Sequence, residues 1–520
     1  MRIFRGETVV RLALFPVALQ LAGCPLTTGS LNNSDGGPTG SSDAGIIAAS
    51  SVLEHHRRPS RDGWYTDSAF TQAAAAALHL DPTFNAQIQG QTYAQPLYLA
   101  GTDGRDRLIV ATEENNVYLL DAANGATILQ RHLGTAARRS QLPCGNLDPL
   151  GITGTPIVDP SSGTLFLDAM TVPTGTSSPT HLVFALSVDD LSTRPGWPVD
   201  VSARIQSPVR FDPTIQNQRS ALALLNATLY VAYGGHWGDC RDYHGWVLGV
   251  PVSTPNNAVA WSTRAVGGGI WGPGGIASDG TSLFVATGNT FGVTQWGDGE
   301  AIIRLPPFLS FSQQSTDFFR PVNWLSLDQQ DLDLGGSGPV LLTVPNSNPS
   351  NLIVALGKNG TAYLVDQSNL GGESATAVFS GQVSSSEIIN AAAAYRTARS
   401  SYVVFRANGT QCPGGQVGDL VALRISGTPP TFQTAWCASQ NGTGSPIVTT
   451  TDGQANAIVW GLGAEGDGRL HGFDGDTGQV VFAGGGSSDA MGGISRFQTP
   501  IVAKGRLFVA GTNRVYAFSP

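Results

Sequence analysis

One arrangement of apolar and polar positions recurs along the chain from about residue 90 onward. An apolar segment, often opened by proline, leads through a short turn into a second segment rich in Leu, Val, Phe and Ala. A third segment and a hairpin follow. Short apolar runs bounded by turn residues are typical of buried β-strands. The second segment occurs eight times, at residues 108–111, 165–167, 229–232, 283–286, 352–355, 402–404, 458–460 and 507–510.

Eight copies of one unit predict a ring of repeated sheets. Residues 63–520 allow about 57 residues per copy, which is enough for a four-stranded blade with extended loops. We therefore expect an all-β fold, an eight-bladed β-propeller of four-stranded antiparallel blades, with a short N-terminal helix. A β-sandwich is the alternative, but it offers no reason for eight copies. Closure of the ring predicts that the last strands, 507–510 and 515–518, share a blade with a strand from near the N-terminal end of the domain.

The turns within the repeat also agree with one another. At residues 120–125 and 473–478 an Asp at the strand end can bind the N–H groups of its own turn, and a Gly supplies the positive φ. Large side chains such as Trp261 and Trp436 lie on the outgoing strands, where they can pack between blades. This strand, Asp-x-x-x-Gly turn and docking Trp resemble the repeat of the eight-bladed quinoprotein alcohol dehydrogenases. The resemblance extends over residues 91–520.

Residues 51–90, ahead of the propeller, are expected to form a helical lead-in. Asp67 or Ser68 can cap a helix that runs through Phe70, the alanines 73–77 and Leu80, before Asp81-Pro82 ends it. We expect this helix to act as a lid or plug on the propeller.

The resemblance implies a site in the central funnel, where pyrroloquinoline quinone (PQQ) lies above a calcium ion. The segment from Gly269 to Gly272 and the later Ala286-Thr287-Gly288-Asn289 are similar to the family segment with the floor Trp and a ligand Asn. By that match Trp271 would stack on PQQ and Asn289 would bind calcium, roles that suit a flat indole and an amide oxygen. Read from the residues alone, Trp271 fills the propeller axis and Asn289 caps a turn.

Other parts of the family's site are altered in this sequence. The Glu ligand position falls on His236, or on Asp239 after a small shift, and imidazole is a poor calcium ligand. The strand at 301–304 runs into Leu305-Pro306 without the expected catalytic Asp, although Arg304 stands in about the right place. No two cysteines are adjacent. If the chain is an enzyme, Asp298 or Glu300 is the nearest candidate for the base.

Two further clusters carry weaker signals. A polar loop at residues 236–244 contains His, Cys and Asp, but without the ligand spacing of a tetrahedral metal site. Asp328, Asp331 and Asp333 resemble a calcium loop only by their number, because the full spacing with a distal Glu is absent. The sequence contains no Gly-x-Ser-x-Gly elbow to support a serine hydrolase.

The N-terminus has the features of an export signal. Three arginines precede a short apolar run at residues 12–21, which is too short to span a bilayer. It ends in Leu21-Ala22-Gly23-Cys24, which resembles the lipobox of bacterial lipoproteins. The resemblance implies a signal peptide at 1–23, lipidation of Cys24 and a flexible linker at 24–50. Because Pro25 replaces the Asp of inner-membrane retention, we expect the outer membrane, facing the periplasm. An ordinary secretory signal is the alternative.

Composition narrows the possible partners and the redox chemistry. The 520-residue chain has a net charge of −9, 13% charged residues and only two lysines, Lys358 and Lys504. A nucleic-acid partner is therefore not expected, because phosphate binding needs a basic face. In an oxidising compartment the four cysteines after Cys24 can form two disulfides. Sequence does not fix the pairing, but Cys412–Cys437 is the closer pair and leaves Cys144–Cys240.

These observations favour a non-enzymatic function. We predict a lipid-anchored binding or scaffolding platform in the bacterial cell envelope, with an envelope protein or a glycan as partner and with no cofactor. His236, Trp271, Asn289 and Arg304 are expected to line its funnel. The alternative is a divergent PQQ-dependent oxidoreductase acting on alcohols or sugars, with PQQ and calcium as cofactors.

Overall fold

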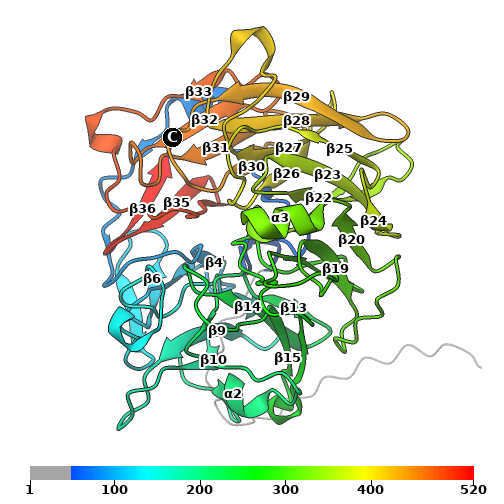
Figure 1. The fold of residues 1–520 in the computed structure, drawn as a ribbon. Helices are drawn as coiled ribbons and strands as arrows, with labels where there is room; N and C mark the ends of the chain where they lie inside the picture. Colours follow the sequence, from blue (N-terminus) through cyan, green and yellow to red (C-terminus); the bar gives the residue numbers. More distant parts are fainter. Residues whose placement is uncertain (1–47) are drawn as a thin grey trace, which may run out of the picture. The chain divides into compact units, whose positions relative to one another are not determined.

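The computed structural model describes residues 48–520, so the predicted signal peptide and Cys24 lie outside the described residues. Eight antiparallel β-meanders follow one another around a ring, as Figure 1 shows. The fold is an eight-bladed β-propeller of four-stranded blades, which confirms the prediction. First strands of neighbouring blades contact one another, for example β13 (Ala223–Leu225) with β17 (Ala277–Ser278), and therefore line the axis.

The first four blades extend from residue 97 to residue 321. Blade 1 contains β4 (Leu97–Leu99), β5 (Arg107–Ala111), β6 (Asn116–Asp121) and β7 (Thr127–His132). Blade 2 contains β8 (Ile157–Asp159), β9 (Thr164–Thr171), β10 (Thr180–Ser187) and β11 (Val199–Asp200). Blade 3 contains β12 (Gln216–Asn217), β13, β14 (Thr228–Gly235), β15 (Trp246–Pro251) and β16 (Val259–Ser262). Blade 4 contains β17, β18 (Leu283–Thr287), β19 (Ala301–Leu305) and β20 (Phe318–Pro321), with β24 (Gly372–Ser374) added in parallel.

The other four blades extend to the C-terminus. Blade 5 contains β21 (Val340–Thr343), β22 (Asn351–Leu356), β23 (Thr361–Asp366) and β25 (Phe379–Gln382). Blade 6 contains β26 (Ala393–Arg396), β27 (Ser401–Arg406), β28 (Leu420–Ser426) and β29 (Thr431–Ala438). Blade 7 contains β30 (Ile447–Thr450), β31 (Ile458–Leu462), β32 (Leu470–Asp474) and β33 (Val480–Phe482), with β1 (Trp64–Thr66) added in parallel. Blade 8 contains β34 (Ile501–Ala503), β35 (Arg506–Gly511) and β36 (Arg514–Ser519).

Helical segments are short. The α-helices are α1 (Gln72–Ala76), α2 (Val201–Arg204) and α3 (Trp324–Gln330). The 3₁₀ turns are η1 (Ala48–Ser50), η2 (Arg139–Gln141), η3 (Pro255–Asn257), η4 (Leu334–Gly336), η5 (Pro413–Gly415) and η6 (Ser487–Asp489). Within residues 48–520 no helix is long and apolar enough to cross a membrane.

The eight apolar segments found in the sequence are the second strands of the eight blades. They are buried because neighbouring sheets pack on both of their faces. Trp436 of β29 shows how one blade docks on the next. It lies against Gly478 in the turn of blade 7, and its indole N–H donates to the Gly475 carbonyl at 2.9 Å. The predicted docking of this tryptophan is confirmed.

The ring closes between the two ends of the domain. Blade 8 is completed by β2 (His79–Leu80) and β3 (Ala86–Gln87), which both pair with β36. Figure 1 shows the red C-terminal strands beside the blue N-terminal segment. A strand from near the N-terminal end therefore shares the last blade, as predicted.

The plug of the propeller is an irregular segment of turns and bends, not the predicted helix. The helix α1 is capped by Thr71, not by Asp67 or Ser68, and Leu80 lies in β2. Backbone groups of residues 52–63 instead hydrogen-bond to the first strands of six blades, β4, β8, β17, β21, β26 and β30. The buried Arg61 guanidinium bonds to Leu222 and Ile276 carbonyls in blades 3 and 4, at 2.8 Å each.

Two disulfides brace the loops. They join Cys144 to Cys240 and Cys412 to Cys437, the two pairs named above, with Cα atoms 5.9 and 5.6 Å apart.

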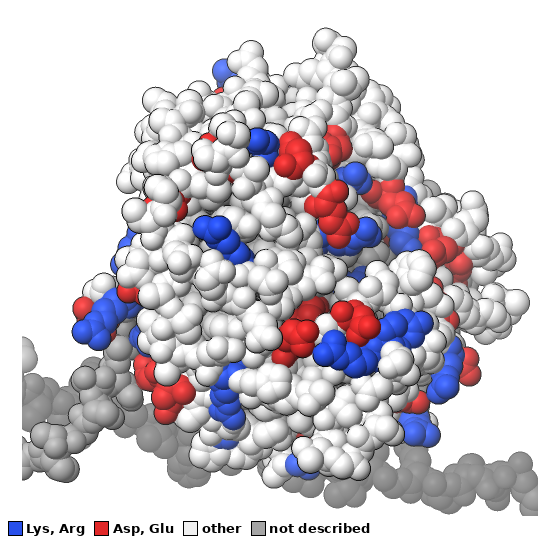
Figure 2. All heavy atoms as spheres, turned by 90° about the vertical axis from the view of Figure 1, so that its left-hand side faces the viewer, with Lys and Arg blue, Asp and Glu red and all other residues white. Residues whose placement is uncertain are grey.

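On the face drawn in Figure 2, basic and acidic side chains lie beside one another, and no patch of one sign covers it.

Candidate functional site

A cavity of about 410 Å³ opens on the propeller axis. It is lined by the loop between β14 and β15, by residues that precede the first strands of blades 4, 6 and 8, and by loops of blades 4 and 5. Because every blade turns its first strand to the axis, loops far apart in sequence meet in this one funnel. His236, Trp271 and Asn289 line it, as predicted from the sequence.

Trp271 lies against backbone in this funnel. A Cβ atom on Gly336 would lie 3.1 Å from the indole ring, and one on Gly234 would lie 3.2 Å from the Trp271 Cβ atom. Larger residues at these glycines would have to displace the indole. The chain therefore seats a flat aromatic ring at one fixed place near the axis.

Lys358 is placed over this ring by the tight turn between β22 and β23. Its ammonium nitrogen lies 5.2 Å from the ring centroid, a cation–π contact. It forms ion pairs with Asp331, at 3.0 Å, and with Asp333. Burial alone would lower the pKa of Lys358, but the two carboxylates outweigh burial and raise it. The ammonium therefore stays charged.

Asp333 is buried beside Asn289. Its carboxylate accepts the Asn289 backbone N–H at 2.6 Å, which joins the loop before β21 to the end of β18. Burial raises the pKa of the Asp333 carboxyl above its ordinary value, although Lys358 and the Asn289 N–H act in the opposite direction. Asp331 is the more exposed of the two carboxylates.

Further charge lies beside the ring. The Arg219 guanidinium is 5.8 Å from the Trp271 centroid and 5.7 Å from that of Phe497. Within residues 48–520 Arg219 forms no ion pair. Arg496 also lines the funnel, but Glu465 neutralises it through a 2.8 Å ion pair. Two cations thus flank the indole ring. Lys358 is ion-paired with two carboxylates, whereas Arg219 is free of ion pairs within the described residues.

His236 takes a structural position at the funnel wall. Its Nε2 atom lies 3.1 Å from the Thr214 carbonyl oxygen, and burial lowers its pKa to about 4. The imidazole is therefore neutral at pH 7. Asp239, three residues on, also lines the funnel and accepts the Tyr243 hydroxyl at 2.8 Å.

Three sequence candidates lie elsewhere. Arg304 was expected in the funnel, but it bonds to Asp317 and to backbone carbonyls at the outer side of blade 4. Ala301, not Arg304, is at the funnel end of β19. Because a strand advances about 3.3 Å per residue, Arg304 lies three residues farther from the funnel. Asp298 is held by Arg264, and Glu300 is fully buried and accepts the Leu334 N–H. Neither carboxylate lines the funnel.

The sequence interpretation named Asp331 and Asp333 only as part of a weak calcium-loop pattern and did not place them in the funnel, which they line. It looked for an Asp directly after residues 301–304, whereas Asp331 and Asp333 follow the helix α3. Lys358, which directly precedes Asn359-Gly360, was not among the site candidates either. The sequence feature that could have identified Lys358 is the rarity of lysine, since it is one of two lysines in 520 residues.

The donor set fits a quinone better than a metal. PQQ is flat and carries several carboxylates, and Trp271 with Lys358 and Arg219 matches that shape and charge. In the described part of the chain, no three His, Cys, Asp or Glu side chains are grouped so that they could hold a metal ion. Asp331 and Asp333 are already paired with Lys358. Nothing in the structure tests calcium binding at Asn289, which stays a prediction, and the function proposed below assigns no step to calcium.

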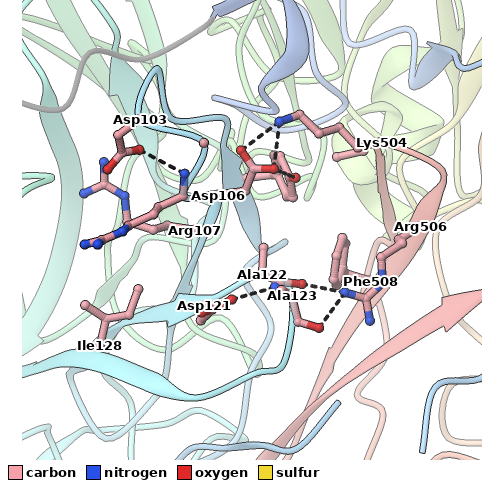
Figure 3. A pocket seen from close by; sticks show the side chains of 14 residues that line it. Asp103, Asp106, Arg107, Asp121, Ala122, Ala123, Ile128, Lys504, Arg506 and Phe508 are labelled. Carbon is pink, nitrogen blue, oxygen red and sulfur yellow. Dashed lines mark hydrogen bonds and ion pairs between the residues drawn. The ribbon is translucent and has the colours of Figure 1, made fainter. Parts of the chain in front are cut away.

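A larger hollow, of about 630 Å³, lies at the seam where blade 8 meets blade 1. Figure 3 shows Lys504 reaching Asp106, and Arg506 reaching the carbonyls of Ala122 and Ala123. Tyr98 also donates to Asp106, at 2.7 Å. These groups bond mostly to one another, so they fasten the ring and leave little for a ligand.

No family model matches the chain, and neither does any curated protein. Solved structures do. A quinohemoprotein alcohol dehydrogenase from Pseudomonas putida HK5 superposes with a TM-score of 0.66 at 13% identity, over 91% of this chain and 81% of its own. The quinohemoprotein alcohol dehydrogenase from Comamonas testosteroni superposes with a TM-score of 0.63 at 13% identity, over 91% of this chain and 81% of its own. A europium-containing methanol dehydrogenase gives 0.62 at 14% identity, over 91% of this chain and 98% of its own.

At such low identity these likenesses show the fold alone. They confirm the resemblance that the repeats indicated, an eight-bladed propeller like that of the quinoprotein dehydrogenases.

Proposed function

We propose that the protein is a quinone-dependent oxidoreductase that binds PQQ over Trp271 and oxidises an alcohol or a sugar. One observation carries the proposal: the funnel brings a seated indole face, two cations and a carboxylate pair together within about 410 Å³. The sequence alone favours a binding platform, largely because no catalytic Asp follows residues 301–304. With Asp331 and Asp333 in the funnel, that reason no longer applies.

The cofactor and the substrate would use different groups. Trp271 would contact the ring face of PQQ, and Arg219 would neutralise one of its carboxylates, while Lys358 keeps Asp331 and Asp333 from repelling them. When bound, PQQ would be the acceptor of the electron pair that leaves the substrate carbon. We assign acceptance of the hydroxyl proton to the Asp331–Asp333 pair, because a general base needs a carboxylate inside the cavity. Lys358 holds both carboxylates in place.

Dye-linked dehydrogenase activity tests the proposal. Purified protein is incubated with PQQ, with and without calcium, and dye reduction is followed with a panel of alcohols and sugars. We expect turnover that is lost in Trp271→Ala and is unchanged in Phe308→Ala, an exposed aromatic outside the funnel. Absence of turnover with every substrate, under conditions in which PQQ binds, would contradict the proposal and favour a non-catalytic binding protein.

Export and lipid anchoring remain part of the proposal. The two disulfides support an oxidising compartment such as the periplasm. If Cys24 carries the lipid, Cys24→Ser should release the chain from the membrane fraction, because stable anchoring depends on acylation at that residue. A Ser variant that still fractionates with membranes after salt and carbonate washing would overturn the anchor.

A further inference from the structure

The funnel has an exposed tryptophan at its mouth. All ten tryptophans of the chain lie in residues 48–520, and Trp237 is the one exposed example, with 67% of its surface accessible. It lines the same cavity as Trp271 but is not needed for packing. An apolar ring left in water at the mouth of a polar cavity favours a role in binding.

The loop that carries Trp237 is held from several sides. The Cys144–Cys240 disulfide ties it to the loop that follows β7, and His236 lies against the Thr214 carbonyl. Tyr243 anchors Asp239 at 2.8 Å. A loop fixed in this way loses little conformational entropy when a ligand settles on the indole, so the binding surface is preorganised.

The polar side chains that share this cavity with Trp237 include two carboxylates, those of Asp239 and Glu387. Glu387 is exposed and forms no ion pair within the described residues. Arg496 is already neutralised by Glu465. The mouth therefore combines one apolar plane with free carboxylate oxygens, which suits a ligand that has both a C–H face and several hydroxyl donors.

We infer that the funnel mouth is a subsite for a neutral pyranose sugar, whose C–H face stacks on Trp237 and whose hydroxyls donate to Asp239 and Glu387. Sugar oxidation rests on the proposed function, but sugar binding does not. A short alcohol has no ring face to cover the indole. A sugar acid would place a third carboxylate in the cavity with those of Asp239 and Glu387.

Ligand-observed NMR on the purified protein tests binding without any cofactor. The probes are D-glucose, D-glucuronate and ethanol. We expect saturation transfer to the ring C–H protons of glucose, and weaker binding of the other two. Trp237→Ala should weaken glucose binding about tenfold or more, the effect of losing one stacking contact. Trp237→Phe keeps a flat ring and should restore most of it, and Phe308→Ala should bind like the wild type. Equal glucose affinity in Trp237→Ala, or no glucose signal at all, would overturn the subsite.

Kinetics separates this inference from the proposed function. With PQQ added, Trp237→Ala should raise KM for glucose with little change in kcat, because the contact is made before and during the reaction alike. If the wild type binds glucose but reduces no dye, the oxidoreductase proposal fails and the subsite stands. If dye is reduced with ethanol and Trp237→Ala leaves the glucose KM unchanged, the subsite fails and the oxidoreductase stands.

Discussion

The hollow at the seam and the funnel on the axis differ in what their charged side chains do. In the larger one, at the seam, Lys504 and Arg506 are paired with Asp106 and Asp81, and the pairs join blade 8 to blade 1 and to the N-terminal segment. In the smaller funnel, Arg219 has no ion-pair partner among the described residues. Asp333 is buried there, and burial raises the pKa of its carboxyl because the charged form loses contact with water. Buried or unpaired charged groups, which lower the stability of the fold, therefore identify a functional site better than the volume of a cavity does.

The two regions each contain one of the chain's lysines. Lys358 lies over an aromatic face, and Lys504 lies on a carboxylate that also accepts a tyrosine hydroxyl. This symmetry supplies matched variants, so that each region can be altered while the other serves as its control.

The largest effect is expected from opening the seam completely. Deleting residues 505–520 removes β35 and β36, leaves β2, β3 and β34 without a partner, and uncovers the apolar faces of blades 1 and 7 that pack on blade 8. We expect the whole domain to lose its cooperative thermal transition, measured by circular dichroism. A truncated chain with the melting curve of the full chain would show that the ring does not depend on its seam.

Removing the funnel carboxylate should act on turnover and not on the fold. Asp333→Asn removes a proton acceptor, and the loss of a general base typically costs about 10²–10⁴ in rate. The matched change at the seam, Asp106→Asn, should leave kcat within about twofold, because Asp106 lies outside the funnel. Steady-state kinetics of both variants checks this. The distinction between the regions is wrong if the two substitutions lower kcat equally.

Most of the fold follows from local sequence, whereas the site does not. Second strands such as 352–355 are recognisable because burial on both faces demands a continuous apolar run. Closure by β2 could be predicted because a propeller cannot leave its edges free. Asp333 and Lys358 come from two loops that meet only after blades 4 and 5 have packed, so no local pattern pairs them. Arg304 was misplaced because its position along β19 depends on where the strand begins.

A buried carboxylate near the axis should shape the pH dependence of stability. Burial raises the pKa of Glu113 from 4.5 to about 7. The folded state then binds more protons than the unfolded state between these values, so stability falls as pH rises from about 4.5 to 7. Glu113→Gln removes that slope and should unfold with a free energy on the order of 3 kcal/mol higher at pH 8. Urea titrations at pH 5 and pH 8 measure it, and an unchanged slope would refute it.

Seam carboxylates should show the opposite slope. Hydrogen bonds from Lys504 and Tyr98 outweigh partial burial and hold the pKa of Asp106 below its ordinary value. Its contribution is present at neutral pH and is lost as pH falls through the folded pKa. Lys504→Ala should therefore cost about 1 kcal/mol or less at pH 7, and less still in acid. A larger loss in acid than at pH 7, measured by the same urea titrations, would contradict this assignment.

Binding of PQQ to the two lysine variants tests the central claim most directly. Titration of PQQ into the purified protein, followed by quenching of tryptophan fluorescence, gives an affinity without any need for turnover. The wild type and Lys504→Ala should bind PQQ equally well, whereas Lys358→Ala should bind it at least about tenfold more weakly, because Asp331 and Asp333 then lose their cation and repel the carboxylates of PQQ. No binding by the wild type, or equal binding by all three proteins, would contradict the account.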